Sequence, residues 1–513
     1  MIKPSSVEGF LLNCNKEFMD KYILAIDAGT TSSRAILFDK NANPIEIAQY
    51  EFNQFFPKEG WVEHDPIEIW NTQLKAIREV IQKSKIDPKN IDSIGITNQR
   101  ETTVIWNKDT GQPVYNAIVW QDRRTASFCD KLKEENKSEL IQNKTGLVID
   151  AYFSGTKIKW ILDSNSEIRQ QADKGQLIFG TIDTWLIWNL SKGKYHLTDP
   201  SNASRTLLYN IKDDMWDDEL LEIFDVPRNI LPKVVDSSAI SAYIDEEILG
   251  IKIPIAGIAG DQQAALFGQL CINPGDIKNT YGTGCFCMMN TGKSAVKSKN
   301  KMLSTIAWRI NGELTYALEG SVFVAGALIQ WLRDKLAIIK DAPEVENLAN
   351  TVKDNGGVTF IPALSGLAAP YWDPYAQGTI FGITRGTENG HIARAALESI
   401  ALRTRDIIIE MQKDADINFT NLKVDGGASN NNLLMQIQSD LLQTNVVRPK
   451  TTETTALGVA FLAGLASGFW KNISDLNDLW IEDRSFKPNL KNDSTQIINL
   501  WETRINKLLK VNE

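Results

Sequence analysis

The sequence is poor in cysteine and histidine, and this limits the kinds of site that it can form. Its 513 residues include five cysteines and three histidines. The cysteine count is odd and no paired zinc spacing occurs, which argues against a disulfide framework and against a structural zinc ion. Cys285 and Cys287 stand two apart in an apolar run, so we expect buried thiols on one face of a strand. A reducing, cytoplasmic location fits this cysteine usage best.

Long apolar runs and an excess of positive charge are also missing. The longest apolar candidate, residues 457–470, is too short to span a bilayer. The net charge is -9, without the basic excess of a general nucleic-acid-binding protein. We therefore expect neither nucleic-acid binding nor stable membrane insertion. Hydrophobic residues make up 43% of the chain and charged residues 23%, as in ordinary globular proteins, and the length favours two or more domains.

The first 18 residues differ from the rest and lack a periodic pattern. We interpret them as a disordered extension, or as the product of a start codon chosen too far upstream. From residue 19 onward, apolar strand-like runs alternate with helical patterns, which indicates the α/β class. Pro274-Gly275-Asp276 is a strong turn signal, and it divides the chain into residues 19–272 and 273–513.

A predicted hairpin near the start carries groups suited to a phosphate. Two apolar runs, 22–26 and 35–39, flank the segment Asp27 to Arg34. Gly29 lets the backbone approach a ligand, and Arg34 offers a planar cation. Asp27 can hold Mg²⁺ through water. Further donors are the hydroxyl groups of Thr30, Thr31 and Ser32. By itself, this segment is better interpreted as an ordinary polar turn, because Gly-Thr-Ser turns are common.

The second half repeats this pattern. Residues 277–281 and 285–289 are predicted strands that flank a tip at Gly282-Thr283-Gly284. Farther on, a short strand ends at Asp425-Gly426-Gly427, before a predicted helix over 433–444. The amide groups at such a helix start can hold a phosphate or the ribose end of a nucleotide. Two hairpins, one in each half, and a Gly-Gly helix start are hard to explain as unrelated turns.

The arrangement resembles the actin-like (ribonuclease H-like) ATPase superfamily, and five motifs in order narrow the resemblance to the FGGY carbohydrate kinase family. They are Asp27 to Arg34, Asn98-Gln99-Arg100-Glu101, Gly260-Asp261-Gln262-Gln263, Tyr281-Gly282-Thr283-Gly284 and Asp425-Gly426-Gly427-Ala428. The similarity covers about residues 20 to 510. One departure is Ala28, where many members that phosphorylate glycerol carry Gln. The resemblance implies two actin-like ATPase domains with the active site in the cleft between them.

Among family members, the motifs are most similar to those of enzymes that phosphorylate glycerol. The resemblance therefore implies ATP-dependent phosphorylation of glycerol to sn-glycerol 3-phosphate. The residues that it assigns to the polyol are Arg100, Glu101, Tyr152, Asp261 and Gln262, with Trp120 and Phe286 beside the carbon face. The residue chemistry agrees, because a triol needs both acceptors and donors, and its carbon backbone needs an apolar wall. Without the motifs, a surface ion pair at Arg100-Glu101 and core aromatics would be the ordinary interpretation.

The resemblance also implies roles in phosphoryl transfer. Asp261, at the end of a predicted strand, is the candidate general base and a possible metal ligand, although it could also be a helix N-cap. Mg²⁺ would bridge the β- and γ-phosphates, with Asp27 as an outer-shell ligand. Contacts to ATP are expected from Thr30, Thr31, Ser32, Arg34, Thr283, Gly326, Gln330, Gly427 and Asn431. Homodimers or homotetramers are usual in the family.

Two alternatives remain open, and one family feature is missing. Another FGGY kinase, acting on a pentulose or a longer polyol, would keep the ATP motifs. An actin-like nucleotide switch would need no polyol site. Some relatives carry a Gly-rich basic loop for fructose 1,6-bisphosphate, but residues 245–252 here hold three acids and one Lys. Glu247 stands at about the position where other relatives carry a phosphorylated His. We expect both controls to be absent.

Overall fold

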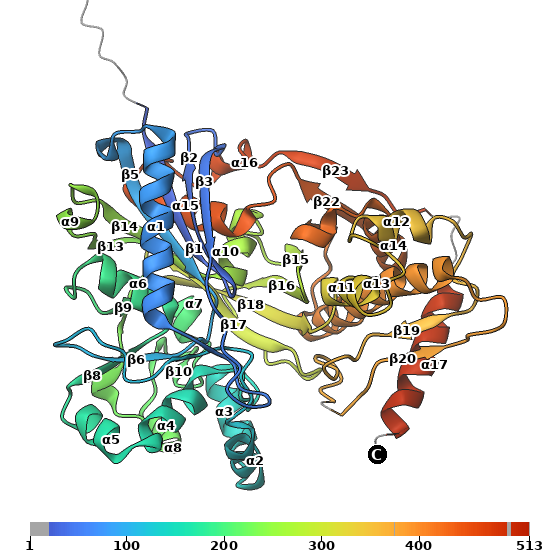
Figure 1. Cartoon of the computed structure of the whole chain (residues 1–513), viewed down its shortest axis with the longest axis horizontal. Coiled ribbons are helices and arrows are strands. Elements are labelled where there is room, and N and C mark those ends of the chain that lie inside the picture. Colours follow the sequence, from blue (N-terminus) through green and yellow to red (C-terminus); the bar gives the residue numbers. More distant parts are fainter. Residues whose placement is uncertain (1–19, 374, 490–493, 512–513) are drawn as a thin grey trace, which may run out of the picture.

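The computed structural model describes residues 20–373, 375–489 and 494–511. The expected extension at residues 1–18 lies outside the described residues. The chain forms a mixed α/β structure in which one thirteen-stranded sheet runs through both halves (Figure 1). The predicted fold class is therefore confirmed. No helix in the described ranges is both long and apolar enough to cross a membrane.

Strands of the first half form one side of this sheet. In spatial order they are β3 (Pro44–Glu51), β2 (Ser32–Phe38), β1 (Tyr22–Ala28), β5 (Ile91–Asn98), β14 (Pro254–Gly260) and β13 (Ser238–Tyr243). The second half continues with β17 (Leu303–Ile310), β18 (Glu313–Val322), β16 (Cys285–Gly292), β15 (Ile277–Tyr281), β21 (Asn421–Asp425), β22 (Asn445–Pro449) and β23 (Glu482–Phe486). The junction between the halves is the pairing of Ser238 in β13 with Ile310 in β17.

The two halves share one topology. In the first half, β1, β2 and β3 are antiparallel neighbours, while β5 and β14 follow β1 in parallel. In the second half, β15, β16 and β18 are antiparallel, while β21 and β22 follow β15 in parallel. The structure thus confirms both predicted hairpins and the internal repeat. Cys285 and Cys287 are buried free thiols on β16, as expected, whereas Cys14 lies outside the described residues.

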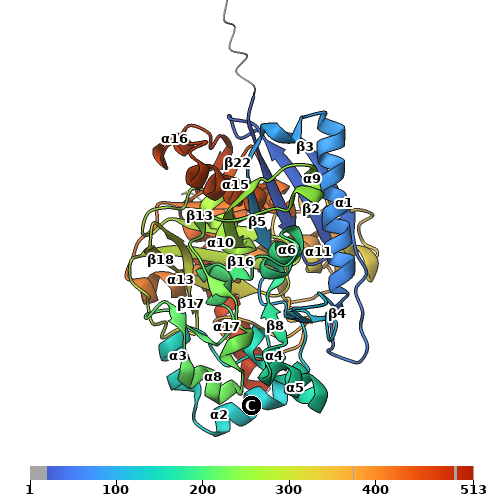
Figure 2. The same ribbon diagram turned by 90° about the vertical axis from the view of Figure 1, so that its left-hand side faces the viewer.

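Helix α1 (Pro66–Ser84) covers β2 and β3. Its N-cap Asp65 accepts a hydrogen bond of 2.8 Å from the Ile67 amide, and Pro66 occupies the first turn. Its apolar face buries Ile69 and Val80 against the sheet. Figure 2 shows α1 running along this face of the first half.

Helix α15 (Thr454–Ser467) belongs to the second half by sequence but packs on the strands of the first. It contacts β1, β5, β13 and β14, and in Figure 1 it lies among them. It also packs tightly on α10 (Asp261–Gly268). A Cβ atom on Gly458 would clash with the Ala264 carbonyl, so glycine permits this close approach. The chain therefore returns to the first half before it ends.

The remaining elements surround the sheet. Residues between β5 and β13 form a layer of short strands and helices: β6 (Val104–Asn107), β7 (Ala117–Ile118), α2 (Ala126–Glu134), α3 (Ser138–Thr145), α4 (Ser154–Ser164), α5 (Ser166–Asp173), β8 (Leu177–Gly180), α6 (Ile182–Leu190), α7 (Pro200–Ala203) and α8 (Asp218–Phe224). Short α9 (Glu246–Leu249) precedes β14. The second half adds α11 (Gly326–Asp334), α12 (Glu344–Ala349), β19 (Thr359–Ile361), β20 (Thr379–Phe381), α13 (Asn389–Ala415), α14 (Asn432–Leu442) and α17 (Thr495–Val511).

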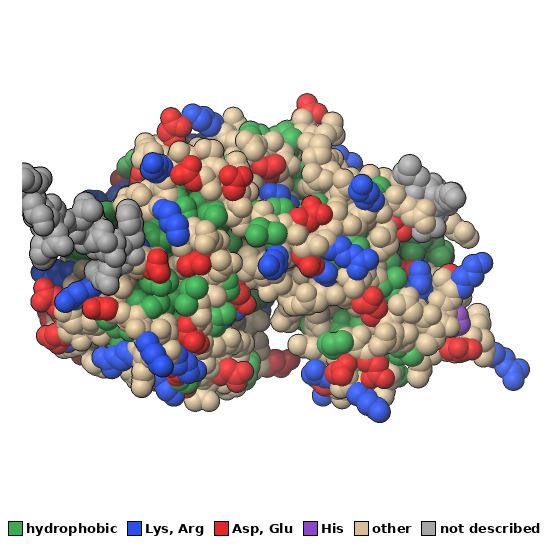
Figure 3. Space-filling model, turned by 90° about the horizontal axis from the view of Figure 1, so that it is seen from above, with side chains coloured by type: hydrophobic (Ala, Val, Ile, Leu, Met, Phe, Trp, Pro, Cys, Tyr) green, Lys and Arg blue, Asp and Glu red, His purple; other side chains and the backbone are tan. Residues whose placement is uncertain are grey.

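Seen from above, the molecular surface is notched between the two halves (Figure 3). Acidic and basic side chains are interspersed over this face rather than gathered into one patch.

Candidate active site

Three parallel strands of the first half end side by side and place the predicted polyol residues together. Ala28 of β1 and Gly260 of β14 both pair with Asn98 of β5. Arg100 and Glu101 follow β5, and Asp261 follows β14. The carboxyl ends of parallel strands are where α/β proteins bind ligands. This register therefore brings a cation and two carboxylates to one edge of the sheet.

Arg100 lies at the centre of this group, and its side chain is buried. Its Nε atom is 3.1 Å from Oδ1 of Asp261 and 3.9 Å from Oε1 of Glu101. Its Nη1 atom is 2.5 Å from Oε2 of Glu319 and donates to Oε1 of Gln263 at 3.1 Å. Arg100 is therefore an internal ion-pairing group, and the interpretation as a surface ion pair is wrong.

Glu101 is held by a second buried arginine. Arg205, which follows α7, donates from Nε to Oε1 of Glu101 at 2.6 Å. Burial raises the pKa of Glu101, and the charges of Arg205 and Arg100 oppose this shift. Arg205 also donates from Nη2 to Oε1 of Glu319 at 3.0 Å. Burial favours the neutral form of Glu319, but Arg100 and Arg205 outweigh it and lower the pKa to about 2.

Asp261 is the first residue of α10 and not its N-cap, because Gly260 occupies the cap position. Its Oδ1 atom accepts a hydrogen bond of 2.7 Å from the Gln262 amide. The side chain keeps 31% of its surface exposed although protein surrounds it. Burial raises its pKa, while Arg100, the Gln262 amide and Lys278 act in the opposite direction. An accessible carboxylate with a raised pKa is suited to accept a proton.

Gln262 is oriented by a buried lysine. Nζ of Lys278, on β15, donates to Oε1 of Gln262 at 2.6 Å and to Oγ1 of Thr280 at 2.8 Å. Burial lowers the pKa of Lys278, and the Asp425 and Asp261 carboxylates counteract this. Because Lys278 occupies the amide oxygen of Gln262, the amide nitrogen is left to donate to a ligand. This orientation supports the predicted donor role.

Three partly buried aromatic side chains form a wall beside these groups. The ring centroid of Trp120 is 5.7 Å from that of Tyr152 and 6.3 Å from that of Phe286. Trp120 donates from Nε1 to Oγ1 of Thr30 at 3.0 Å, which links the wall to the first hairpin. Nη2 of Arg100 donates to the Tyr152 hydroxyl at 3.4 Å. The structure thus brings together all the residues that were assigned to the polyol.

The residues of the first hairpin that are expected to contact ATP or Mg²⁺ differ in their exposure and in their partners. Asp27 and Arg34 are cross-strand partners, and Nη2 of Arg34 is 2.6 Å from Oδ2 of Asp27. Nη1 of Arg34 is 2.8 Å from Oε2 of Glu453, just before α15. Thr31 is exposed at the tip, whereas Ser32 is buried and accepts a hydrogen bond of 3.1 Å from Gln49. Thr31 is therefore more available to a ligand than Ser32.

The second hairpin packs on the start of α11. The Gly326 amide donates to the Gly282 carbonyl at 3.0 Å, and a Cβ atom on Gly326 would lie 2.6 Å from that oxygen. Glycine at 326 thus lets α11 approach the tip closely. Thr283 at the tip and Gln330 on α11 are both exposed.

The Gly426-Gly427 segment leads to the predicted helix through a short turn of another kind. A 3₁₀ helix at Gly427–Asn430 comes first, and α14 begins at Asn432. Asn431 caps α14, since its Oδ1 atom accepts from the Leu434 amide at 2.8 Å. Gly426 has φ 84°, and a Cβ atom there would lie 2.5 Å from the Tyr281 carbonyl. Gly427 faces open space, so the main chain there can approach a ligand.

These donors fit a nucleotide that carries its own metal ion. No group of three metal-ligating side chains occurs within residues 20–373, 375–489 and 494–511. Mg²⁺ bound to substrate phosphates needs only one or two carboxylates, because water and phosphate supply the other ligands. Asp27 and Asp261 are carboxylates of this kind at the ends of β1 and β14.

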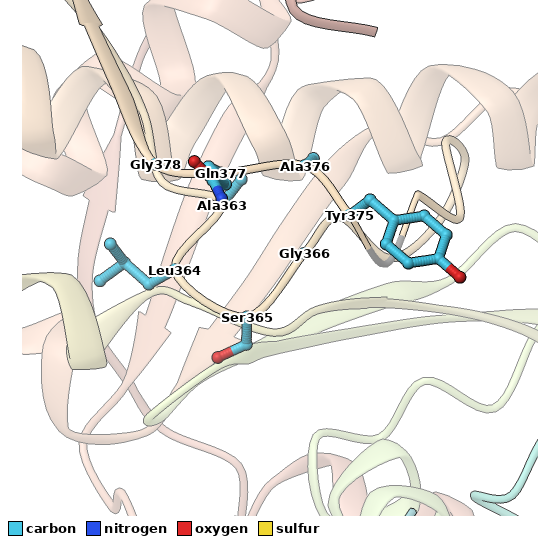
Figure 4. Close-up of a pocket in the computed structure, with 8 residues that line it drawn as sticks. All are labelled: Ala363, Leu364, Ser365, Gly366, Tyr375, Ala376, Gln377 and Gly378. Atoms are coloured by element: carbon cyan, nitrogen blue, oxygen red, sulfur yellow. The ribbon is translucent and has the colours of Figure 1, made fainter. Parts of the chain in front are cut away.

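A separate open pocket of about 470 Å³ is formed by the two ends of the connection between β19 and β20 (Figure 4). Its lining residues are Ala363, Leu364, Ser365, Gly366, Tyr375, Ala376, Gln377 and Gly378. None of them carries a charge or belongs to the predicted site. This pocket therefore lacks the groups that phosphoryl transfer needs.

Comparison with known proteins identifies the family. The profile of the FGGY family of carbohydrate kinases, N-terminal domain, matches residues 22–268, and the profile of its C-terminal domain matches residues 277–467. The chain belongs to the FGGY carbohydrate kinase family. Both hairpins and all the residues assigned to the polyol lie within the two segments that match the FGGY profiles.

Similar FGGY kinases cover almost the whole chain. Glycerol kinase 2 of Thermotoga maritima is 57% identical over 95% of this chain and 99% of its own length. A glycerol kinase of Nitratidesulfovibrio vulgaris is 59% identical over 95% of this chain and 98% of its own. Among solved structures, Plasmodium falciparum glycerol kinase with ADP has a TM-score of 0.89 and 37% identity, covering 96% of this chain and 98% of its own.

Proposed function

We propose that this FGGY kinase transfers the γ-phosphoryl group of ATP to glycerol and releases sn-glycerol 3-phosphate and ADP. The observation that carries this proposal is the cluster of residues assigned to the polyol. In it, the polar side chains of Arg100, Glu101, Asp261 and Gln262 lie beside an aromatic wall formed by Trp120, Tyr152 and Phe286. Full-length relatives named glycerol kinase support the same acceptor.

The acceptor site matches a short triol. Carboxylate oxygens of Glu101 and Asp261 accept hydrogen bonds from hydroxyl groups, while the guanidinium of Arg100 and the amide of Gln262 donate. Lys278 fixes the direction of that amide. The Trp120 and Phe286 rings cover the carbon face. Such a site can hold one terminal hydroxyl against Asp261.

Proton transfer is assigned to Asp261. Its carboxylate takes the proton of the attacking hydroxyl as the oxygen bonds to the γ-phosphorus and the bond to the ADP oxygen breaks. Asp261 is 31% exposed, and burial raises its pKa, so its basicity exceeds that of an ordinary aspartate. Asp27 would hold Mg²⁺ through water, with Asp261 as a possible second ligand. When bound, this ion neutralises phosphate charge.

The phosphates are proposed to lie between the two hairpin tips. Thr30, Thr31 and Arg34 face them from the first half, with Ser32 in a lesser role, and Thr283 faces them from the second. The nucleoside is proposed to contact Gly326, Gln330, Gly427 and Asn431. The exposure of Thr31, Thr283 and Gln330 and the open space at Gly427 support this arrangement.

One assay tests the acceptor. ADP release is measured with glycerol, erythritol, xylulose or no acceptor, and ³¹P NMR identifies the phosphorylated product. Stoichiometric sn-glycerol 3-phosphate and ADP are expected with glycerol. Turnover mainly with xylulose would identify a pentulose kinase, and equal ADP release without any acceptor would indicate a nucleotide switch.

The proposal also covers the location, the oligomeric state and the domain division of the enzyme. We place the enzyme in the cytoplasm as a homodimer or homotetramer, by similarity to its family; light scattering after size-exclusion chromatography tests the oligomeric state. We also propose that residues 19–272 and 273–513 act as two functional domains, with α15 mechanically part of the first because it packs on β1, β5 and β14.

A further inference from the structure

One fully buried carboxylate beside the polyol group joins two arginines. Glu319 on β18 and Arg205 after α7 are both 0% exposed. Oε1 of Glu319 accepts from Nη2 of Arg100 and from Nη2 of Arg205, each at 3.0 Å. Oε2 accepts from Nη1 of Arg100 at 2.5 Å. The second half of the chain thus supplies the anion that holds two cations of the first half.

We propose that Glu319 and Arg205 are positioning residues that determine the affinity for the polyol by fixing Arg100 and Glu101. We call the pair the Glu319–Arg205 brace. This inference rests on the proposed function, because it concerns the same acceptor site. Glu319 accepts hydrogen bonds from both terminal nitrogens of Arg100, and Arg205 donates one to Oε1 of Glu101 at 2.6 Å. Neither brace residue is assigned to the polyol itself.

The brace leaves the substrate-facing groups free for hydroxyls. Without Glu319, the carboxylates nearest to Arg100 are Asp261 at 3.1 Å and Glu101 at 3.9 Å. Arg100 would then draw in both carboxylates, because a buried guanidinium needs anionic partners. The two acceptors needed by a triol would be occupied by an internal ion pair. Loss of the brace should therefore weaken glycerol binding more than ATP binding.

The test compares Glu319→Gln with the wild-type enzyme by steady-state kinetics. We expect KM for glycerol to rise about tenfold or more, while KM for ATP changes less than about twofold. Glu319→Asp retains the charge and should bring the KM for glycerol back toward the wild-type value. A merely structural role would not change the ratio of the two KM values.

A matched control separates these effects from loss of stability. Asp406 is a buried carboxylate on α13 that pairs with Arg403 at 3.3 Å and accepts hydrogen bonds from Tyr371 and Trp501, none of which is assigned to the acceptor site. Asp406→Asn should lower the melting temperature but leave the ratio of the two KM values unchanged.

A second variant covers the case in which Glu319→Gln does not fold. The double variant Arg205→Gln/Glu319→Gln removes one charge of each sign and still lacks the brace, so it should fold and retain the raised KM for glycerol. Three outcomes would overturn the proposal. They are a normal KM for glycerol in a folded variant, equal rises in the KM values for glycerol and ATP, and failure of both variants to fold. Failure of the proposed function would differ: the wild-type enzyme itself would not use glycerol, and the same ratios would be measured with the acceptor that it does use.

Discussion

Replacement of Asp261 by asparagine removes the proposed base with little change in shape. The Gln262 amide donates to Oδ1 of Asp261 at 2.7 Å, and the asparagine side chain would keep an oxygen for this hydrogen bond. It would lose the negative charge that takes the hydroxyl proton. General bases contribute about 10²- to 10⁴-fold to the rate, equal to about 3–5 kcal/mol of transition-state stabilisation. We therefore expect Asp261→Asn to lower kcat by this factor.

The fold should tolerate this change because Arg100 keeps its other partners. Nη1 and Nη2 of Arg100 remain 2.5 Å and 3.0 Å from the Glu319 oxygens. The guanidinium is therefore not left unpaired, which is the main route to a large loss of stability at buried charges. We expect a free energy of unfolding within about 1 kcal/mol of the wild-type value. ATP affinity should also be retained.

The assay measures ADP release at saturating glycerol and ATP, together with ATP binding by calorimetry and a thermal melt. Asp218→Asn is a matched control, because Asp218 is also the first residue of its helix, α8, and pairs with Arg228 at 2.6 Å. The control should keep full activity. Near-normal kcat for Asp261→Asn, with product formation verified, would refute the assignment of Asp261 as the base.

The pH profile gives a second criterion for the same assignment. Burial raises the pKa of Asp261, and the base acts in its ionised form. Activity should therefore fall as the pH is lowered through this raised pKa, at a higher pH than for an ordinary aspartate. The residual activity of Asp261→Asn should lack this limb. An unchanged limb in the variant would assign it to another group.

Three further predictions concern stability, motion and regulation. Burial lowers the pKa of His64 from 6.5 to about 4, so the unfolded chain binds the proton first as the pH falls through this window. The melting temperature should drop there, and less so in His64→Gln; equal drops would contradict this. Small-angle scattering should show compaction, about a hinge at residues 271–276, with glycerol and a non-hydrolysable ATP analogue; an unchanged radius with both bound would count against closure. Fructose 1,6-bisphosphate should not inhibit, since Lys192 and Lys194 pair with Glu247 and Asp245 near α9; clear inhibition would place a site elsewhere.

The sequence predicts the elements whose signals are local. Asp65 and Pro66 are a local signal for the start of α1, because a cap and a fixed φ act within one turn. Both hairpins follow from strand-like runs around small-residue tips. The residues that the resemblance assigns to the polyol each lie in a motif or short stretch of the family pattern, and the structure brings them together. Local chemistry and motif order were sufficient to propose them.

Residues that act only through tertiary contacts were missed. Arg205 and Glu319 are 114 residues apart, and neither stands in a segment with a recognisable ligand pattern. Lys278 lies in the middle of a predicted strand, and nothing in the sequence indicates that it orients Gln262. The sequence also does not reveal how exposed a polar residue is. Ser32 belongs to the tip that is expected to bind phosphate, yet it is buried and bonded to Gln49, which no pattern in the tip indicates.

The arginine–glutamate pairs that connect the halves lie in two kinds of environment, which assign them different roles. Arg100 and Glu319 are 2% and 0% exposed, so neither can lose its partner without leaving a buried charge. Arg34 and Glu453 are 28% and 30% exposed, and water screens their attraction. A phosphate can therefore replace Glu453 as a partner of Arg34 at little cost, since the released carboxylate is solvated. We therefore expect the proposed acceptor side of the site to be pre-formed, and the proposed nucleotide side to exchange partners when ATP binds and ADP leaves.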